Sequence, residues 1–265
     1  MVIDFHTHAF PDAIAERAIA SLVKSSGGIY PPCSDGTAAG LLACMDRFGV
    51  SASVLQPVIT KPSQLHSLNE WAKSLSSDRL IPFGGIHPKT ENYKADIDFV
   101  ASLGLRGLKF HAEYQGFSVD APEMLPIYDY AFEKGLIVLH HAGFDPAFPP
   151  PFHSSPAQFA HIADEMKGGT LVVAHLGGQR QHEDVLRHLV GKNVYLETSM
   201  GFSEYTEEHF LRVVRAHGAD KILFGSDAPW GRADLEITAI RNSPLAEEEK
   251  NAILGANAAK LLGLA

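Results

Sequence analysis

Cysteine is scarce in this chain of 265 residues, which contains only Cys33 and Cys44. Two cysteines are too few for a disulfide framework in a chain of this length, so we interpret both as free thiols that pack in the fold. Apolar runs of membrane-spanning length are also lacking, and the chain starts without the basic and apolar segments of a signal peptide. These absences predict a soluble cytoplasmic protein.

Positive charge is the second shortage. The 22 Lys and Arg residues are outnumbered by 31 Asp and Glu residues, which gives a formal charge of -9 and a pI near 5.8. Nucleic acids and anionic membranes attract clustered Lys and Arg, so neither is expected as a partner, and a small-molecule substrate is expected instead. No Pro/Gly/Ser-rich or charged linker divides the chain, so we expect one domain over residues 1–265.

Short aliphatic runs alternate with helical segments along the whole chain. The predicted strands are Val2–Phe5, Ser53–Val58, Leu80–Ile86, Gly107–Phe110, Leu136–His140, Thr170–Ala174, Val194–Glu197 and Ile222–Gly225. The predicted helices are Ala38–Phe48, Gln64–Leu75, Tyr93–Leu103, Pro122–Lys134, Ser155–Met166, Glu183–Val190, Thr206–His217 and Ala233–Arg241. Near-continuous apolar strands joined by helices are typical of a parallel sheet that is covered on both faces. Eight such repeats in roughly 250 residues predict an α/β fold, the (β/α)8 TIM barrel.

The end of the chain and two long connections complete this architecture. A closing helix is predicted over Leu245–Leu264, because the acidic residues 247–249 favour the positive end of a helix dipole. The connections Phe10–Asp35 and Gly143–Ser154 follow strands at the face where barrels bind substrates, so we interpret them as lids or as surface excursions with packed aromatics. A doubly wound open sheet is the competing architecture, but the first strand lacks the Gly-x-Gly-x-x-Gly turn of its nucleotide-binding version.

Histidine is frequent, with 14 residues, and seven of them lie in or just after apolar runs. In a parallel barrel the carboxyl ends of all strands meet at one face, where active sites are built. Polar residues at these ends should therefore lie close together. They are His6 and His8 on strand one, Lys109 and His111 on strand four, His140 and His141 on strand five, His175 on strand six, and Asp227 on strand eight.

Each of these residues has a structural interpretation when it is taken alone. His140 and His141 are adjacent, so only one of them can face the site, and we predict that it is His141. His175 could bond a carbonyl group, and Asp227 could cap the helix that follows Pro229. Four histidines and one aspartate at the ends of four strands are difficult to assign to coincidence.

Three histidine nitrogens and one carboxylate form a site for Zn²⁺, or for Mn²⁺, Fe²⁺ or Co²⁺, with water in an open position. Such an ion can lower the pKa of its bound water to about 7, or polarise a substrate oxygen. Asp227 can take the proton of that water, and His175 can polarise a carbonyl group or shuttle the proton. Asp4 precedes the histidine pair and is interpreted as a structural carboxylate that supports the ligands.

Taken together, these motifs resemble the amidohydrolase superfamily, in the amidohydrolase-related branch that includes aminocarboxymuconate semialdehyde decarboxylase. The stretches that carry the resemblance span the chain: Val2–His8 (VIDFHTH), Arg106–His111 (RGLKFH), Val138–Gly143 (VLHHAG), Val173–Gly178 (VAHLGG), Phe224–Pro229 (FGSDAP) and Ala256–Leu264 (ANAAKLLGL). The resemblance implies a barrel that holds one divalent metal ion and a general acid/base or electrophile. By similarity the metal ligands are His6, His8, His141 and Asp227, and the acid/base is His175.

Two further residues keep alternative roles under this resemblance. Lys109 is expected to contact a substrate carboxylate or to pack within its strand, and it could instead bridge two metals, because some superfamily members carboxylate a lysine of strand four. His111 is expected to contact the substrate or to support the ligands. Gly84–Pro88 (GGIHP) is similar to the TatD-like deoxyribonuclease branch, but that branch has a strand-four glutamate where this chain has the Lys109 region, and the acidic charge also argues against a nuclease.

The leading interpretation is a metal-dependent hydrolase of a small ester, lactone or amide, with metal-activated water as the nucleophile. The alternative is a metal-dependent non-oxidative decarboxylase of an aromatic or unsaturated carboxylic acid, in which His175 or Asp227 moves the proton. A third, non-enzymatic interpretation is a barrel with a structural metal ion or none, and the position of the ligands at the catalytic end of the barrel argues against it. The resemblance also implies a homodimer.

Overall fold

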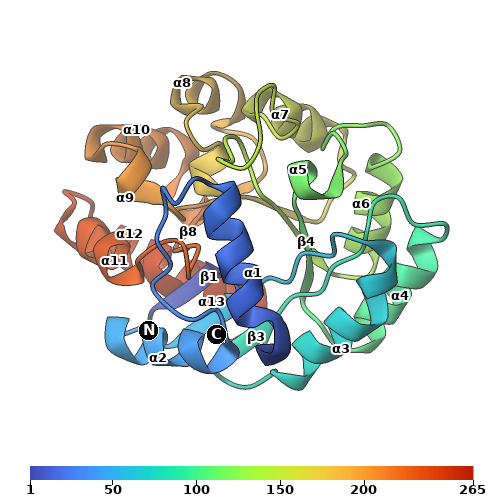
Figure 1. Cartoon of the computed structure of the whole chain (residues 1–265). Coiled ribbons are helices and arrows are strands. Elements are labelled where there is room, and N and C mark those ends of the chain that lie inside the picture. The colour runs from blue at the N-terminus through green and yellow to red at the C-terminus, as the bar shows by residue number, and fades with distance from the viewer. Residues whose placement is uncertain (265) are drawn as a thin grey trace.

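Eight parallel strands surround one axis in the computed structural model, which describes residues 1–264 (Figure 1). The described strands are β1 (Ile3–Thr7), β2 (Ala52–Leu55), β3 (Leu80–Pro82), β4 (Gly107–Phe110), β5 (Ile137–His140), β6 (Thr170–Val173), β7 (Tyr195–Glu197) and β8 (Ile222–Leu223). They pair in the order β1-β2-β3 and β4-β5-β6-β7-β8, and every pair is parallel.

Two sets of main-chain contacts join these sheets into a ring. Between β3 and β4, the N–H of Lys109 donates to the carbonyl of Gly84 at 2.9 Å. Between β8 and β1, the N–H of Asp227 donates to the carbonyl of His6 at 2.8 Å, and Thr7 bridges Ala228. The (β/α)8 barrel that the sequence predicts is therefore confirmed.

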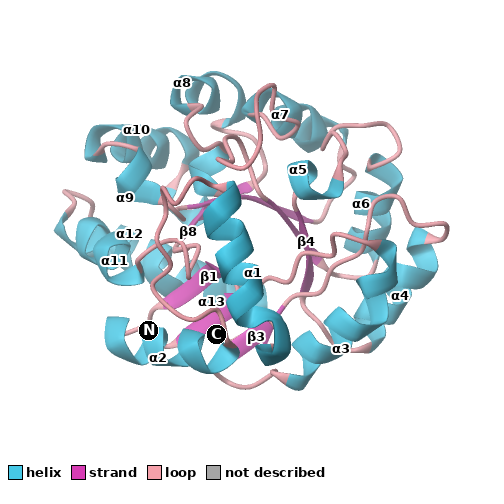
Figure 2. Cartoon of the chain, in the orientation of Figure 1, coloured by secondary structure: helices cyan, strands magenta, loops and turns pink. Residues whose placement is uncertain are grey.

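Helices form the outer ring of the barrel (Figure 2). The helices are α1 (Asp12–Ser25), α2 (Ala38–Phe48), α3 (Leu65–Ser74), α4 (Tyr93–Ser102), α5 (Ala112–Gln115), α6 (Leu125–Glu133), α7 (Pro156–Glu165), α8 (His182–Asp184), α9 (Gly201–Glu204), α10 (Glu207–His217), α11 (Ala233–Asn242), α12 (Glu247–Asn251) and α13 (Asn257–Leu262). Short 3₁₀ turns are η1 (Pro62–Gln64), η2 (His175–Gly177) and η4 (Ala219–Lys221), and π-helical turns are η3 (Val185–Leu189) and η5 (Ala252–Ala256). Among residues 1–264, no helix is both long and apolar enough to cross a membrane.

The two hydrophobic clusters of the core follow the alternation of side chains along the strands. Inside the barrel, Phe5, Phe83 and Leu139 belong to one buried cluster. On the other face, Leu108 and Val138 belong to a second cluster that the strands share with the surrounding helices. Successive side chains of a strand point to opposite faces, so on β4 this alternation turns Lys109 toward the centre of the barrel. On β1 the register shifts between Asp4 and Thr7, and His6 also reaches the cavity although Phe5 belongs to the inner cluster.

Most predicted elements agree with the structure, and α2 agrees at both ends. The hydroxyl group of Thr37 accepts a hydrogen bond from the N–H of Gly40 at the start of α2, and Gly49, with φ of 74°, ends it in the left-handed region. Three predicted strands are too long by two residues or more, and one of them is β2, which ends at Leu55 instead of Val58. β3 stops at Pro82, which has no N–H for the ladder, and β8 stops at Leu223, after which the N–H of Gly225 donates to the hydroxyl group of Thr198.

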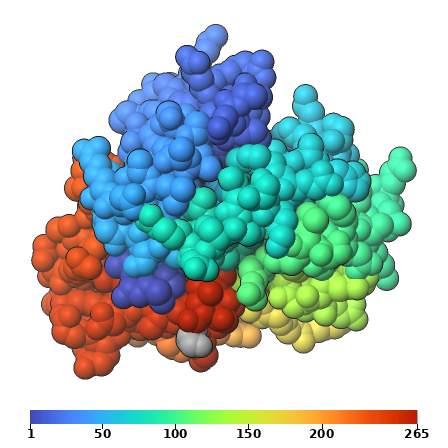
Figure 3. Space-filling model, turned by 90° about the horizontal axis from the view of Figure 1, so that it is seen from below, coloured from blue at the N-terminus to red at the C-terminus, as the bar shows by residue number. Residues whose placement is uncertain are grey.

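The closing helix predicted over Leu245–Leu264 is divided into α12, the π-helical turn η5 and α13. A Cβ atom on Gly255, within η5, would lie 2.4 Å from the carbonyl oxygen of Met1, so only glycine allows this close passage. Ala258 and Leu262 of α13 pack into the cluster inside the barrel. Figure 3 shows the last part of the chain beside the N-terminal residues at the lower edge of the molecule.

The connection Phe10–Asp35, interpreted from the sequence as a lid or a surface excursion, contains a helix of 14 residues, α1, which is not among the predicted helices. In Figure 1 this helix crosses in front of the barrel, and in Figure 3 the same residues form the top of the molecule. The helix therefore covers the end of the barrel at which the strands finish.

The buried carboxyl group of Glu236, on α11, should make stability depend on pH. Its two oxygens lie 3.2 and 3.3 Å from the N–H of Phe202, and burial raises its pKa from 4.5 to about 8. Because the folded state holds this proton more tightly than the unfolded state, stability is lost as the pH rises from about 4.5 to about 8. Glu236→Gln should remove that loss, worth on the order of a few kcal/mol.

Thermal unfolding at pH 5 and pH 9 measures this effect. Glu236→Gln should raise the melting temperature at pH 9 by several degrees relative to the unsubstituted protein, and much less at pH 5. Glu248→Gln, at an exposed position of α12, is the matched control and should change neither value. An equal change at both pH values would show that Glu236 does not carry the pH dependence.

Candidate active site

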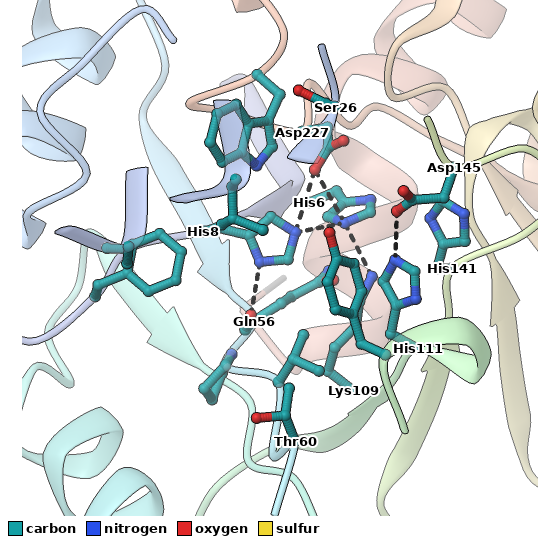
Figure 4. A pocket seen from close by; sticks show the side chains of 18 of the residues that line it. His6, His8, Ser26, Gln56, Thr60, Lys109, His111, His141, Asp145 and Asp227 are labelled. Carbon is teal, nitrogen blue, oxygen red and sulfur yellow. Dashed lines mark hydrogen bonds and ion pairs between the residues drawn. The ribbon is translucent and has the colours of Figure 1, made fainter. Parts of the chain in front are cut away.

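A cavity of about 310 Å³ lies at the carboxyl ends of the strands, beneath α1. Its polar side chains gather at the strand ends (Figure 4). The imidazole, amine and carboxyl side chains that line it are those of His6, His8, Lys109, His111, His141, Asp145 and Asp227. Most of the residues expected at the strand ends are therefore brought together in one place.

The register of three neighbouring strands explains why His111 and His141 lie at the same level. Phe110 pairs with His140, and His140 pairs with Val173. The residues that follow these pairs continue the ladder for one more step, because the N–H of His141 donates to the carbonyl of Phe110 at 3.1 Å. His111 and His141 are consequently neighbours, and their rings stack with centroids 4.0 Å apart.

His6, His8 and Asp227 form one group of potential metal ligands. The Nε2 atoms of His6 and His8 are 3.0 Å apart, and the Oδ1 atom of Asp227 lies 3.4 Å from the first and 3.1 Å from the second. Asp227 reaches this position with φ of 65°, in the left-handed region of the backbone. All three ligand atoms lie within 4.8 Å of one another.

The hydrogen bonds behind these two imidazoles fix which nitrogen carries the proton. The Nδ1 atom of His8 lies 2.8 Å from the carbonyl oxygen of Gln56, which can only accept, and Nδ1 of His6 lies 2.8 Å from Oε1 of Glu197. Each Nδ1 therefore donates, and each Nε2 presents a lone pair toward the carboxylate of Asp227. Three acceptors that face one another need a cation between them, so this donor set fits a divalent transition metal.

Lys109 supplies one positive charge beside this group. Its side chain is fully buried on β4, and its Nζ atom lies 2.9 Å from Nε2 of His6. Burial lowers the pKa of the amine to about 8, while the carboxylates of Asp227 and Glu197 oppose the decrease. Burial, and then the charge of Lys109, hold the pKa of His6 well below its usual range, which is consistent with a neutral imidazole.

Two buried carboxyl groups support His6 from behind. Asp4 accepts hydrogen bonds from the N–H of His6 at 3.1 Å, and from the N–H and hydroxyl of Ser226 at 2.9 and 2.6 Å. Burial raises the pKa of Asp4 to about 7. Asp4 thus ties β1 to the segment that carries Asp227, which is the structural position that the sequence indicated for it.

Glu197 is the second of these carboxyl groups, and our reading of the sequence did not assign it to the site. Besides His6, it accepts hydrogen bonds from the hydroxyl of Ser199 at 2.7 Å and from the N–H of His175 at 3.0 Å. Burial raises its pKa to about 7. A signal was present, because Glu197 ends the seventh predicted strand just as the other site residues end theirs.

A second group of potential ligands contains His111, His141 and Asp145. Nε2 of His111 lies 3.2 Å from Oδ2 of Asp145. His141 lines the cavity, and its Nδ1 atom lies 2.9 Å from Nε2 of His175 behind it. Asp145 was not assigned to the site from the sequence, and its position four residues after His141 in the same connection is the only signal for it.

His175 and His140 have different surroundings from those of His141. His175 is buried but is not among the residues that line the cavity; its Nδ1 atom lies 2.9 Å from the hydroxyl oxygen of Ser199. His140 points toward the helices, where its ring stacks on Phe110 at 5.1 Å and lies near Phe159. Burial lowers the pKa of His140 to about 3. The structure therefore turns His141, and not His140, toward the cavity.

The two long connections meet at the mouth of the cavity. The hydroxyl of Tyr30, after α1, donates to Glu204. The Nε atom of Arg180 donates to Oε2 of Glu204 at 2.7 Å, and its guanidinium group lies 3.9 Å from the ring centroid of Phe144. These contacts hold the segment that carries α1 against the segment that begins at Gly143.

Comparison with known proteins matches the chain to one family model and to solved structures of the same fold. Residues 3–264 match the family model described as amidohydrolase. No curated protein matches the chain significantly in sequence. The three solved structures described next share 16–17% of its residues, so they establish the fold alone.

Three solved structures are similar to this chain over nearly its whole length. 5-Carboxyvanillate decarboxylase from Novosphingobium aromaticivorans, with bound manganese, has a TM-score of 0.75 and 16% identity, covering 100% of this chain and 97% of its own. 2,6-Dihydroxybenzoate decarboxylase from Rhizobium has a TM-score of 0.69 and 16% identity, with coverages of 99% and 98%. A probable 2-pyrone-4,6-dicarboxylic acid hydrolase from Acinetobacter baumannii has a TM-score of 0.67 and 17% identity, with coverages of 99% and 99%.

Proposed function

The chain belongs to the amidohydrolase family, and from this premise we propose that it is a metal-dependent decarboxylase of a small aromatic or unsaturated carboxylic acid. The sequence led first to a hydrolase and kept decarboxylation as the alternative. The structural neighbours favour that alternative, because two of the three described above are decarboxylases of aromatic acids and one is a hydrolase.

The observation that carries the proposal is the position of Lys109. Its fully buried amine lies at the polar end of the cavity, 2.9 Å from Nε2 of His6. Burying a cation is costly unless an anion balances it. Asp227 and Glu197 already favour the charged amine. When a metal ion engages Asp227, a substrate carboxylate would supply a further anion at the point where the reaction takes place, whereas a neutral ester or lactone would not.

His6, His8 and Asp227 would hold the metal ion, with His141 as the fourth ligand that the resemblance implies. When bound, a divalent ion would polarise and orient the oxygens of the substrate. Manganese in one structural neighbour supports a divalent ion, and it gives no support to the zinc that the sequence ranked first. The assignment of His141 is a proposal, because its Nδ1 atom is directed to His175 in the structure.

Side chains of this protein would bind the substrate, exclude water and transfer the proton. Lys109 binds the carboxylate, and the apolar walls exclude water from the rest of the substrate. Asp227 faces the cavity, where it would take up a proton from water before the substrate fills the site and then deliver that proton to the carbon that bears the carboxylate. The bond between that carbon and the carboxylate then breaks, its electrons return to the unsaturated system, and carbon dioxide leaves. His175 lies behind His141 and would orient its ring, and His111 would contact the substrate, held by Asp145.

Hydrolysis is the second candidate, favoured by the probable hydrolase among the structural neighbours. In that reaction Asp227 would take a proton from water instead of delivering one to carbon. The two reactions use the same cavity, so their products decide between them.

A parallel assay separates the candidates. Protein loaded with Mn²⁺ should release carbon dioxide from members of a panel of hydroxylated benzoic acids and unsaturated acids, and a chelator should stop the release. The same preparation should leave a panel of lactones and esters intact. Hydrolysis of lactones without any release of carbon dioxide would replace our proposal by the second candidate, and inactivity of the metal-loaded protein on both panels would contradict both.

A further inference from the structure

The cavity has two unlike ends, and this difference bears on the substrate of the proposed decarboxylase. The ligand group and Lys109 lie at one end, where the strands finish (Figure 4). At the other end the lining comes from α1 and from the segments around α3. Residues of this second end include Ile14, Ala18, Leu22, Leu68 and Trp71.

The apolar end is built by one face of α1. Ile14, Ala18 and Leu22 are spaced four residues apart, so their side chains lie one above another on the helix. All three are partly buried, whereas Glu16 and Arg17 on the same helix are exposed. The helix thus presents hydrocarbon to the cavity and its charges to solvent.

Within the lining of the cavity, positive charge is confined to the other end, and Arg180 at the mouth is already paired with Glu204. Among the described residues that line the cavity, Lys109 is the only lysine, and there is no arginine. The acidic side chains of Asp145 and Asp227 also line it. One substrate carboxylate can therefore be balanced by Lys109, and a second would lie against hydrocarbon or beside an aspartate.

Several neutral donors of the lining are already engaged. The hydroxyl of Tyr30 donates to Glu204, and the hydroxyl of Ser26 donates to the carbonyl of Val23 at 3.1 Å. The hydroxyl of Thr60 donates to Oε1 of Gln64 at 3.1 Å. A second carboxylate could recruit these groups only by breaking their present hydrogen bonds, which leaves other polar groups without partners.

We propose that this cavity selects acids with a single carboxylate and an apolar planar body that lies beneath α1, and that it rejects dicarboxylic acids of the same size. The inference rests on the proposed function for the position of the reacting carboxylate. The selection comes from the missing second cation, since a desolvated carboxylate without a partner is strongly unfavourable. Leu22 is the position from which such a cation would reach the apolar end.

Binding can be measured without turnover, because both tryptophans of the chain, Trp71 and Trp230, line the cavity. Quenching of their fluorescence in the Mn²⁺-loaded protein should show that benzoate binds at least about tenfold more tightly than benzene-1,3-dicarboxylate. Leu22→Lys should strengthen binding of the dicarboxylate and reduce this preference at least about tenfold. Ala18→Lys, one turn away on the same face of α1, is the second variant, for use if Leu22→Lys does not fold.

Leu235→Lys is the matched control. Leu235 is 57% exposed on α11, so this substitution adds the same charge away from the cavity. It should leave the preference unchanged. Equal binding of both acids by the unsubstituted protein, no binding of either, or an unchanged preference in the folded lysine variants on α1 would overturn the inference. Selective binding of benzoate together with the absence of carbon dioxide release from every acid tested would instead contradict the proposed function and leave the selectivity intact.

Discussion

Asp227→Asn is expected to abolish turnover and to release the divalent ion while the barrel stays folded. The Oδ1 atom of Asp227 faces the Nε2 atoms of His8 and His6 at 3.1 and 3.4 Å. An amide at this position cannot supply the negative charge that the ion requires, and it cannot carry the proton that the reaction needs. Loss of both roles should lower kcat/KM by at least about 10³-fold.

Asparagine is the informative replacement because of the backbone. Asp227 has φ of 65°, a conformation that asparagine adopts more readily than most residues, so the substitution should not disturb the fold. Metal content by mass spectrometry, kcat/KM and thermal unfolding form the set of measurements. Asp184→Asn, at a surface ion pair with Arg187, is the control and should keep both metal and activity. Full metal content and normal turnover in the Asp227 variant would contradict the assigned ligand group.

Lys109→Met is expected to lower kcat/KM for the carboxylate substrate by about 10²-fold or more while the metal is retained. Lys109 is fully buried, and methionine fills a similar volume. The substitution removes the positive charge that we propose pairs with the substrate carboxylate. The loss should appear mainly as a higher KM. Because a buried amine is replaced by an apolar group, the melting temperature should stay the same or rise.

The same variant separates the roles that the sequence left open for Lys109. A carboxylated lysine that bridges metals would be a ligand, so its replacement would reduce the metal content. A lysine that contacts substrate would leave the metal content unchanged and would alter binding of carboxylates alone. Lys192→Met, at the surface pair with Asp164, is the control. A metal-free Lys109 variant would contradict our assignment and favour bridging.

The sequence predicted the order and type of most elements because each strand carries its own apolar run and each helix its own period. α2 agrees at both ends, since Thr37 and Gly49 encode them locally. The errors arose where contacts with distant residues decide the structure. The last helix contains a π-helical turn at Gly255, where the carbonyl of Met1 lies close to the backbone, and no local pattern shows that contact.

For the candidate site, the residues at strand ends could be predicted, and their partners could not. His6, His8 and Asp227 were found because parallel strands bring their ends together. Glu197 was missed although it ends a strand, since its role is visible only when its carboxylate lies 2.8 Å from the imidazole of His6. Asp145 lies in a connection whose path no periodic pattern describes.

By itself, the sequence determined the barrel and the chemical types of the groups at its catalytic end, because apolar periodicity and strand boundaries are local properties. The tertiary structure alone decided how those groups face one another. It turned His141 to the cavity and His140 to the helices, and it directed the Nε2 lone pairs of the first two strand-end histidines toward Asp227. It also placed the apolar face of α1 over the cavity. These features depend on side-chain direction and on contacts between segments far apart in the chain, which local pattern does not encode.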